Sequence, residues 1–353
     1  MKTTSLRWGF FGAGKCTHDF VSALKLLPLD HHKVVGIASR DSNKAEDFAE
    51  KLGIEQAFGN YSELAESDNV DIIYIGTVNS EHFHQAKLAL LHGKHVLCEK
   101  PVCINRAQVE ELVAIAKDKD LFFMEGFWTF FFPATRKLLE EIKQGSIGKV
   151  VQMTVEIGNK FYHLDRFSRK DIGGGTLLNH GVYGLMFAHQ IFGQPSSISA
   201  SGIISASGTD ESVAITLTYR DTAQIASIIC SSKVNMPGEL RVIGTQGMLK
   251  LKFPFWAPTI LETPTETLQF DLPLNLEAIK FNNLNSSGFT YEAETVRQCI
   301  LNGWRECPIV GWNASRAVMG VADEVRRQLG IVFPHDNNTL HASEICADKG
   351  QRA

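Results

Sequence analysis

The chain has 353 residues, a net charge of −4 and 44% hydrophobic residues, which is typical of a globular protein with room for two domains. No basic run is interleaved with aromatic residues, which argues against a nucleic-acid surface, and no apolar stretch is long enough for a membrane span. The first residues lead directly into an apolar strand, so we expect no signal peptide. Seven scattered cysteines without CxxC spacing fit reduced thiols and a cytoplasmic location.

The first predicted strand, residues 6–11, runs into Gly12-Ala13-Gly14, and a helix is predicted from Lys15 onward. Glycine allows the backbone to turn tightly and to approach a pyrophosphate, which then lies at the positive end of the helix. Gly12, Gly14 and Lys15 are therefore predicted cofactor contacts. The third glycine of this pattern is absent, because Thr17 occupies its position.

The second predicted strand, residues 33–38, ends at Ser39-Arg40. An acidic residue at this position would bind a free ribose 2′-hydroxyl and would repel a phosphate. A hydroxyl and a guanidinium favour a 2′-phosphate instead. Although Asp41 follows closely, Ser39 and Arg40 predict NADP rather than NAD.

Further apolar strands are predicted at 71–76, 95–98 and 121–124, separated by amphipathic helices. This alternation predicts a parallel sheet covered on both faces, which is an α/β Rossmann domain over residues 1–126. Ligands of such sheets bind beyond the carboxyl ends of the strands. The loops at these ends supply the remaining predicted cofactor contacts, which are Thr77, Asn79, His82, Glu99 and Lys100.

These contacts differ in how specific they are. Asn79 suits an ordinary helix N-cap as well as it suits a cofactor contact. Glu99 fits a brace for its loop better than a chemical role. Lys100, next to Pro101 at the end of a central strand, lies where the nicotinamide is expected, which favours a functional lysine over a surface lysine in a turn.

Residues 127–336 have a different pattern, in which strands with alternating apolar and polar residues are interrupted by helices. The pattern predicts an α+β domain with a large open, mainly antiparallel sheet. A sheet of this size commonly buries its spare face against another subunit, so we expect a homodimer through this sheet. The polar residues 337–353 are predicted to be a disordered tail.

Within this domain, Gly173-Gly174-Gly175 precedes a predicted helix over residues 176–192. Asn179 and Tyr183 are four residues apart and would share one face of it, whereas His180 would be rotated away and is expected to be structural or exposed. A helical tyrosine is usually a core residue, but the glycines and Asn179 make Tyr183 a candidate for catalysis. His82 and His84 lack the spacing of a metal site, so no metal is expected.

Three motifs together resemble the glucose–fructose oxidoreductase / inositol dehydrogenase superfamily, and within it a subgroup of dihydrodiol and NADP-dependent D-xylose dehydrogenases. They are Gly12-Ala13-Gly14, Glu99-Lys100-Pro101 and the segment from Gly173 to Tyr183. The resemblance implies hydride transfer between nicotinamide and a carbinol carbon of a sugar, polyol or vicinal diol. Lys100 and Tyr183 match the family's catalytic lysine and tyrosine. We expect the ammonium to favour the Tyr183 phenolate, which would take the hydroxyl proton.

Two residues depart from the family pattern. Asn179 stands where the family has aspartate, and Phe130 stands where it has arginine. Asn179 could still bind a substrate hydroxyl, but without charge. The alternative hypothesis is therefore an NADP-binding protein with weak or no catalysis, in a sensor or structural role. A reductase with another carbonyl substrate lies between the two. The substrate pocket is expected near residues 161–169 and Trp256.

Overall fold

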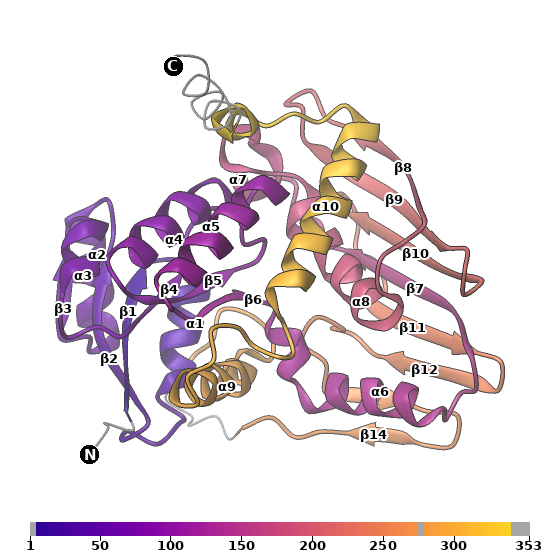
Figure 1. Ribbon diagram of the computed structural model, residues 1–353, viewed down its shortest axis with the longest axis horizontal. Coiled ribbons are helices and arrows are strands. Elements are labelled where there is room, and N and C mark those ends of the chain that lie inside the picture. The colour runs from indigo at the N-terminus through magenta and orange to yellow at the C-terminus, as the bar shows by residue number, and fades with distance from the viewer. Residues whose placement is uncertain (1–4, 274–278, 340–353) are drawn as a thin grey trace, which may run out of the picture.

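The computed structural model describes residues 5–273 and 279–339, which form two sheets with their helices (Figure 1). The first sheet contains six parallel strands in the order β3-β2-β1-β4-β5-β6. Its order reverses between β1 and β4, and this switch point is where ligands of open α/β sheets bind. The strands are β1 (Leu6–Phe11), β2 (His32–Ala38), β3 (Gln56–Phe58), β4 (Ile72–Ile75), β5 (His95–Glu99) and β6 (Phe123–Gly126).

Helices cover both faces of this sheet because the crossovers run in opposite directions from the switch point. The helices on one side are α1 (Lys15–Leu24) and α2 (Ser42–Leu52), and those on the other are α3 (Tyr61–Glu66), α4 (His82–Leu91) and α5 (Arg106–Asp118). Side chains of Asp41, Asn60 and Asn105 accept a backbone N–H at the starts of α2, α3 and α5. By contrast, the N-cap position of α1 is Gly14, and no side chain of the described residues caps this helix.

The second sheet has eight strands in the order β14-β13-β12-β11-β7-β10-β9-β8, and all neighbours are antiparallel except β7 and β10. The predicted α/β plus α+β architecture is therefore confirmed. Helices α6 (Pro133–Gln144), α8 (Val182–Phe192) and α10 (Trp312–Leu329) lie on one face (Figure 1). The strands are β7 (Val150–Gly158), β8 (Ser197–Ile204), β9 (Asp210–Tyr219), β10 (Gln224–Ser231), β11 (Glu239–Gly244), β12 (Gly247–Leu251), β13 (Ile260–Glu262) and β14 (Thr267–Gln269).

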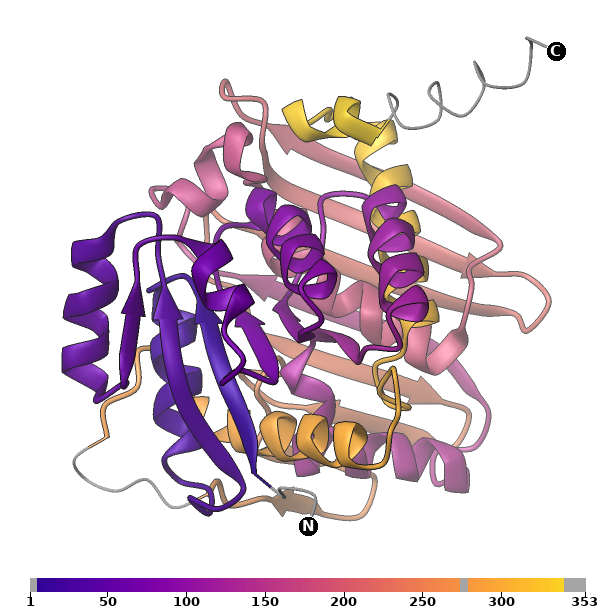
Figure 2. The same ribbon diagram turned by 60° about the vertical axis from the view of Figure 1, so that its left-hand side comes forward.

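The C-terminal part of the chain returns to the first sheet. Helix α9 (Phe289–Leu301) packs on α1, where the rings of Phe20 and Phe289 are 5.4 Å apart. Helix α10 lies beside α5 (Figure 2), and the Trp312 indole N–H donates to the Phe123 carbonyl oxygen of β6 at 2.8 Å. The cores of both sheets are thus continuous, and a boundary at residue 126 stays a prediction.

The predicted helix over residues 176–192 is not uniform. Leu177–Gly181 forms a π-helical turn, and α8 begins only at Val182. Most of the predicted tail, 340–353, lies outside the described residues, whereas its first three residues belong to a short 3-10 helix, Pro334–Thr339.

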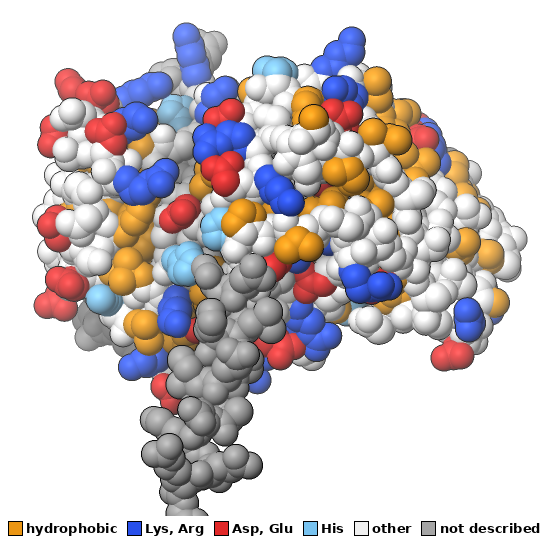
Figure 3. All heavy atoms as spheres, turned by 90° about the horizontal axis from the view of Figure 1, so that it is seen from above, with side chains coloured by type: hydrophobic (Ala, Val, Ile, Leu, Met, Phe, Trp, Pro, Cys, Tyr) orange, Lys and Arg blue, Asp and Glu red, His pale blue; other side chains and the backbone are white. Residues whose placement is uncertain are grey.

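The surface seen from above in Figure 3 carries basic and acidic side chains side by side, with hydrophobic side chains between them. None of the helices in the described ranges has the length and apolar character that crossing a membrane requires.

Candidate functional site

The turn between β1 and α1 has the geometry that a dinucleotide pyrophosphate requires. Gly12 has φ +94°, and a Cβ there would come 2.5 Å from the Thr77 methyl group. A Cβ on Gly14 would come 3.2 Å from the Gly76 carbonyl oxygen. Because α1 has no side-chain cap among the described residues, its first N–H groups are open to an anion. The exposed Lys15 stands at the same helix end.

Thr17, which replaces the third glycine, is fully buried where α1 crosses the end of β4. Its hydroxyl lies so close to Gly76 that a Cβ on Gly76 would collide with it. The third glycine normally allows helix and strand to approach each other. Here Gly76 provides that closeness from the strand side, so the dinucleotide turn tolerates Thr17.

At the end of β2, Ser39 is buried and Arg40 is exposed. Arg40 forms no ion pair with any residue in the described part of the chain, and its charge opposes the burial that raises the pKa of Tyr61. Asp41 faces α2 instead, where it accepts the Lys44 backbone N–H at 3.3 Å. A hydroxyl and an uncompensated cation therefore lie together where the ribose of a dinucleotide would be bound.

The loop after β4 is held by its own polar side chains. Thr77 donates to the Gln85 amide oxygen at 2.8 Å, and Asn79 donates to the Gly173 carbonyl oxygen at 2.9 Å. Burial lowers the pKa of His82 to about 4, and its Nδ1 lies 2.8 Å from the Pro101 carbonyl oxygen. Asn79 is not an N-cap, because Val78 occupies that position. Thr77 thus ties the loop to α4, while Asn79 and His82 contact the backbone of two other loops, and the contact of all three with a cofactor stays a prediction.

Glu99 and Lys100 lie at the end of β5, at the centre of the site. The Tyr74 hydroxyl donates to one Glu99 carboxylate oxygen at 2.8 Å, and the Lys100 backbone N–H donates to the other at 3.3 Å. Burial raises the pKa of Glu99, while the Lys100 charge opposes the rise. Lys100 Nζ donates to the Asn179 carbonyl oxygen at 3.0 Å and lies 4.9 Å from the centre of the Tyr183 ring.

Tyr183 is buried, and its hydroxyl accepts the Trp128 indole N–H at 3.1 Å. Burial raises the pKa of Tyr183 well above its usual range, and the Glu99 charge adds to this rise. The expectation that Lys100 favours a phenolate is therefore wrong for this structure, because the ammonium lies against the ring and desolvation dominates. Burial therefore favours the neutral hydroxyl form of Tyr183.

Asn179 and His180 lie in the π-helical turn. The Asn179 amide donates to the carbonyl oxygens of Arg166 and Gly175, both at 2.8 Å, which leaves only its oxygen for a ligand. His180 is buried with its ring 4.8 Å from that of Phe167, and burial lowers its pKa to about 3. It is thus a neutral packing residue, although it also borders the cavity described below.

The three glycines before this turn pass close to protein groups. A Cβ on Gly174 would collide with the Arg169 carbonyl oxygen, and one on Gly175, which has φ +121°, would collide with Asp210. Asp210 is buried and accepts the Leu177 backbone N–H at 2.6 Å. Gly175 therefore allows the loop to pack tightly against Asp210, which holds the start of the turn that carries Asn179 through its bond to the Leu177 N–H.

A cavity of about 140 Å³ joins these groups. It brings together the predicted residues Glu99, Lys100, Asn179 and Tyr183, and Trp256 and the 161–169 segment also line it, as expected. Phe130 is not in the lining, because it is buried against Phe187 with ring centres 4.7 Å apart. The lining residues that the sequence did not indicate are Cys16, Trp128, Ile157, Asn159, Asn283 and Phe289.

Asn283 reaches the cavity because Asp19 of α1 holds its loop. The buried Asp19 carboxylate accepts the backbone N–H groups of Asn282 and Asn283 at 2.8 Å, and the Ser286 hydroxyl at 2.9 Å. It also accepts both asparagine side-chain amides, at 2.9 and 2.8 Å. The Asp19 carboxylate thus joins α1, the helix after the dinucleotide turn, to the loop that forms one wall of the cavity.

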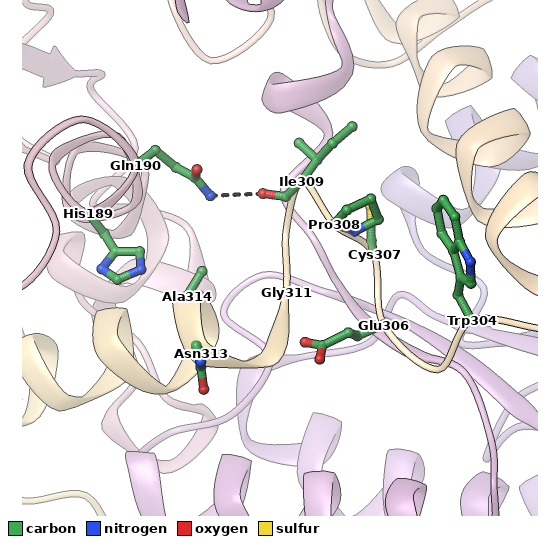
Figure 4. Close-up of a pocket in the computed structure, with 10 residues that line it drawn as sticks. All are labelled: His189, Gln190, Trp304, Glu306, Cys307, Pro308, Ile309, Gly311, Asn313 and Ala314. Carbon is green, nitrogen blue, oxygen red and sulfur yellow. Dashed lines mark hydrogen bonds between the residues drawn. The ribbon is translucent and has the colours of Figure 1, made fainter. Parts of the chain in front are cut away.

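A larger cavity of about 520 Å³ lies elsewhere, between the end of α8 and the connection from α9 to α10 (Figure 4). His189, Glu306 and Asn313 border it, and the Gln190 amide donates to the Ile309 carbonyl oxygen at 2.8 Å. None of the residues predicted from the sequence lines it. We therefore place the candidate site at the smaller cavity, which adjoins the dinucleotide turn.

The chain is similar to known proteins over most of its length. A model of an oxidoreductase family with an NAD-binding Rossmann fold matches residues 6–127, and a model of the GFO/IDH/MocA C-terminal domain matches residues 135–250. Trans-1,2-dihydrobenzene-1,2-diol dehydrogenases from Bos taurus and Xenopus tropicalis are 39% and 37% identical over 95% and 93% of this chain, and over 100% and 99% of their own.

Among solved structures, KijD10, a 3-ketoreductase from Actinomadura kijaniata in complex with NADP and TDP-benzene, is 26% identical with a TM-score of 0.76. The match covers 92% of this chain and 98% of that chain. The matches thus span both sheets. The chain belongs to the GFO/IDH/MocA family of oxidoreductases with an NAD-binding Rossmann fold.

Proposed function

We propose that this protein is an NADP-dependent dehydrogenase that acts on a carbinol carbon of a sugar, polyol or vicinal diol. The observation that carries the proposal is the meeting of Lys100 and Tyr183 in one cavity beside the dinucleotide turn. The dihydrodiol dehydrogenase relatives and the NADP complex of KijD10 support the reaction class and the cofactor.

Bound nicotinamide supplies the hydride acceptor or donor. In the reduction direction, the neutral Tyr183 hydroxyl gives its proton to the substrate oxygen, and Trp128 fixes the position of that hydroxyl. Lys100 uses one N–H on the Asn179 carbonyl oxygen, so two remain to bind a substrate oxygen. In the oxidation direction, Tyr183 must first lose its proton, which its raised pKa opposes.

Titration of the intrinsic fluorescence with NADPH and NADH, followed by a polyol and diol panel monitored at the reduced-nicotinamide absorbance, tests this proposal. Binding with turnover is expected. NADPH binding without turnover would favour the alternative of an inactive NADP-binding protein, for which the occupied Asn179 amide is the structural argument. Absence of NADPH binding would contradict both.

Replacement of Arg40 by alanine is expected to weaken NADPH binding by about 10- to 100-fold, since a charge-assisted contact to phosphate is lost. NADH has no 2′-phosphate, so its dissociation constant should stay within about twofold. Fluorescence titration measures both, with Lys44→Ala as the control because Lys44 lies in the same segment beside Asp41. Equal losses for the two cofactors would refute the 2′-phosphate contact.

We also propose a homodimer through the outer face of the second sheet, in the cytoplasm. Ile203, Ile229 and Met248 are exposed on three strands of that face, at 63%, 43% and 40%. The six described cysteines are free thiols, which fits a reducing compartment. Sedimentation equilibrium should give twice the chain mass of 39.1 kDa, and a mass of one chain would contradict the dimer.

A further inference from the structure

We propose that the substrate of this site carries a carboxylate and that Arg166 selects it, so that the preferred substrate is a polyhydroxy acid of monosaccharide size. The inference rests on the proposed dehydrogenase function and specifies its substrate class. Arg166 lies in the short helix α7 (Asp165–Ser168), which borders the cavity.

Arg166 is exposed to solvent, and its backbone and ring contacts place it at the rim of the cavity. Its carbonyl oxygen accepts the Asn179 amide at 2.8 Å, and the next residue, Phe167, is fully buried. The guanidinium carbon lies 5.2 Å from the Phe167 ring centre and 5.6 Å from that of Phe161. Two aromatic rings of the cavity wall therefore hold the guanidinium at the cavity rim.

The charge of Arg166 is not neutralised within the described part of the chain, where it forms no ion pair. The adjacent carboxylates of Asp165 and Asp171 both pair with Arg169. Glu99, the carboxylate in the cavity lining, is already bound by the Tyr74 hydroxyl and the Lys100 backbone. Arg166 and Lys100 both oppose protonation of His180, in addition to its burial, so both charges act in the cavity.

A site with two cations and one hydrogen-bonded carboxylate attracts an anionic group. The planar guanidinium matches a carboxylate through two parallel hydrogen bonds, as an ammonium does not. Trp128, Trp256 and Phe289 provide apolar walls of the kind that stack on a sugar ring, and the cavity of about 140 Å³ leaves little room beyond one such ring. A neutral diol would form no ion pair with the exposed Arg166 guanidinium, whereas a carboxylate would.

The test compares D-glucuronate, D-glucose and D-glucose 6-phosphate, which differ only at C6, as substrates with NADP. The wild type is expected to have a higher kcat/KM for glucuronate than for glucose. Arg166→Gln should lower kcat/KM for glucuronate by about 10- to 100-fold and that for glucose by less than about threefold. Arg169→Gln is the matched control, because Arg169 is already paired with two aspartates, and it should preserve the preference.

Several results would overturn the inference. A wild type that prefers glucose leaves the dehydrogenase in place but removes the carboxylate selection, and a preference for glucose 6-phosphate assigns Arg166 to a phosphate. Loss of NADPH affinity in Arg166→Gln assigns it to the cofactor. If no substrate is turned over, glucuronate binding is measured instead, as the shift in unfolding temperature that it causes in the NADP complex. A stabilisation by glucuronate that Arg166→Gln removes supports the carboxylate site even though the proposed function fails, and no stabilisation overturns both.

Discussion

Replacement of Tyr183 by phenylalanine is expected to lower kcat by at least about 100-fold, because the variant has no proton to give to the substrate oxygen. NADPH affinity should stay within a few-fold, since the ring and its contact with Lys100 are kept. In the wild type, the oxidation rate should rise with pH in the alkaline range, because burial holds the pKa of Tyr183 high and only its deprotonated form accepts a proton. Steady-state kinetics from neutral to alkaline pH measure both effects.

Tyr219→Phe is the matched control for this variant. Tyr219 lies on β9, outside the lining of the cavity, and its side chain is also buried. Its hydroxyl has no hydrogen-bond partner in the described ranges. The Tyr219→Phe variant should turn over substrate at the wild-type rate. Full activity of Tyr183→Phe would show that another group transfers the proton, and a lost rate in both variants would indicate a general effect of removing buried hydroxyls.

Replacement of Asp19 by alanine is expected to destabilise the protein by about 3–5 kcal/mol, because buried donors lose the carboxylate that they share. The donors come from Asn282, Asn283 and Ser286, so the loop that carries Asn283 into the cavity should detach as well. We expect KM for the substrate to rise along with the loss of stability. Urea unfolding and steady-state kinetics of the same preparation measure the two effects.

Asp41→Ala provides the comparison for this variant. The Asp41 carboxylate is on the same domain but is exposed, and it accepts one backbone N–H at the start of α2. Loss of such a cap should cost about 1 kcal/mol and leave KM unchanged. If Asp19→Ala costs no more than Asp41→Ala, the contacts of Asp19 do not hold the two parts of the chain together.

The sequence predicted those parts of the site whose residues lie at strand ends. Gly12 and Lys100 were found because parallel strands bring their carboxyl ends to one edge. Tyr183 lies in α8 instead and was found because a glycine-rich loop precedes it. Arg166 lies within the 161–169 segment that was expected to shape the pocket. Asn283 and Phe289 gave no such signal, since their place depends on contacts with α1, more than 260 residues earlier.

Local detail was predicted less well for physical reasons. Helix periodicity placed Asn179 and Tyr183 on one face, but it does not reveal a π-helical turn, which here is fixed by the Leu177 N–H bond to Asp210. Charge proximity suggested a phenolate at Tyr183, whereas burial, which depends on the packing of both sheets, determines its pKa. The short strands β13 and β14 have too little pattern to stand out from their neighbours. Helix α6 was not predicted, although its sequence carries helix signals, with Pro133 in the first turn and Gly145 just after the last.

The return of α9 and α10 to the first sheet bears on the order in which the protein is made. Phe20 on α1 packs on Phe289, and Phe123 of β6 accepts a hydrogen bond from Trp312 and donates one to the Arg305 carbonyl oxygen. A ribosome releases these segments last. While the chain is still being synthesised, all six strands of the first sheet are present, but the apolar side chains that α9 and α10 later cover are exposed. A nascent chain stopped before residue 289 should therefore bind chaperones that the finished protein does not.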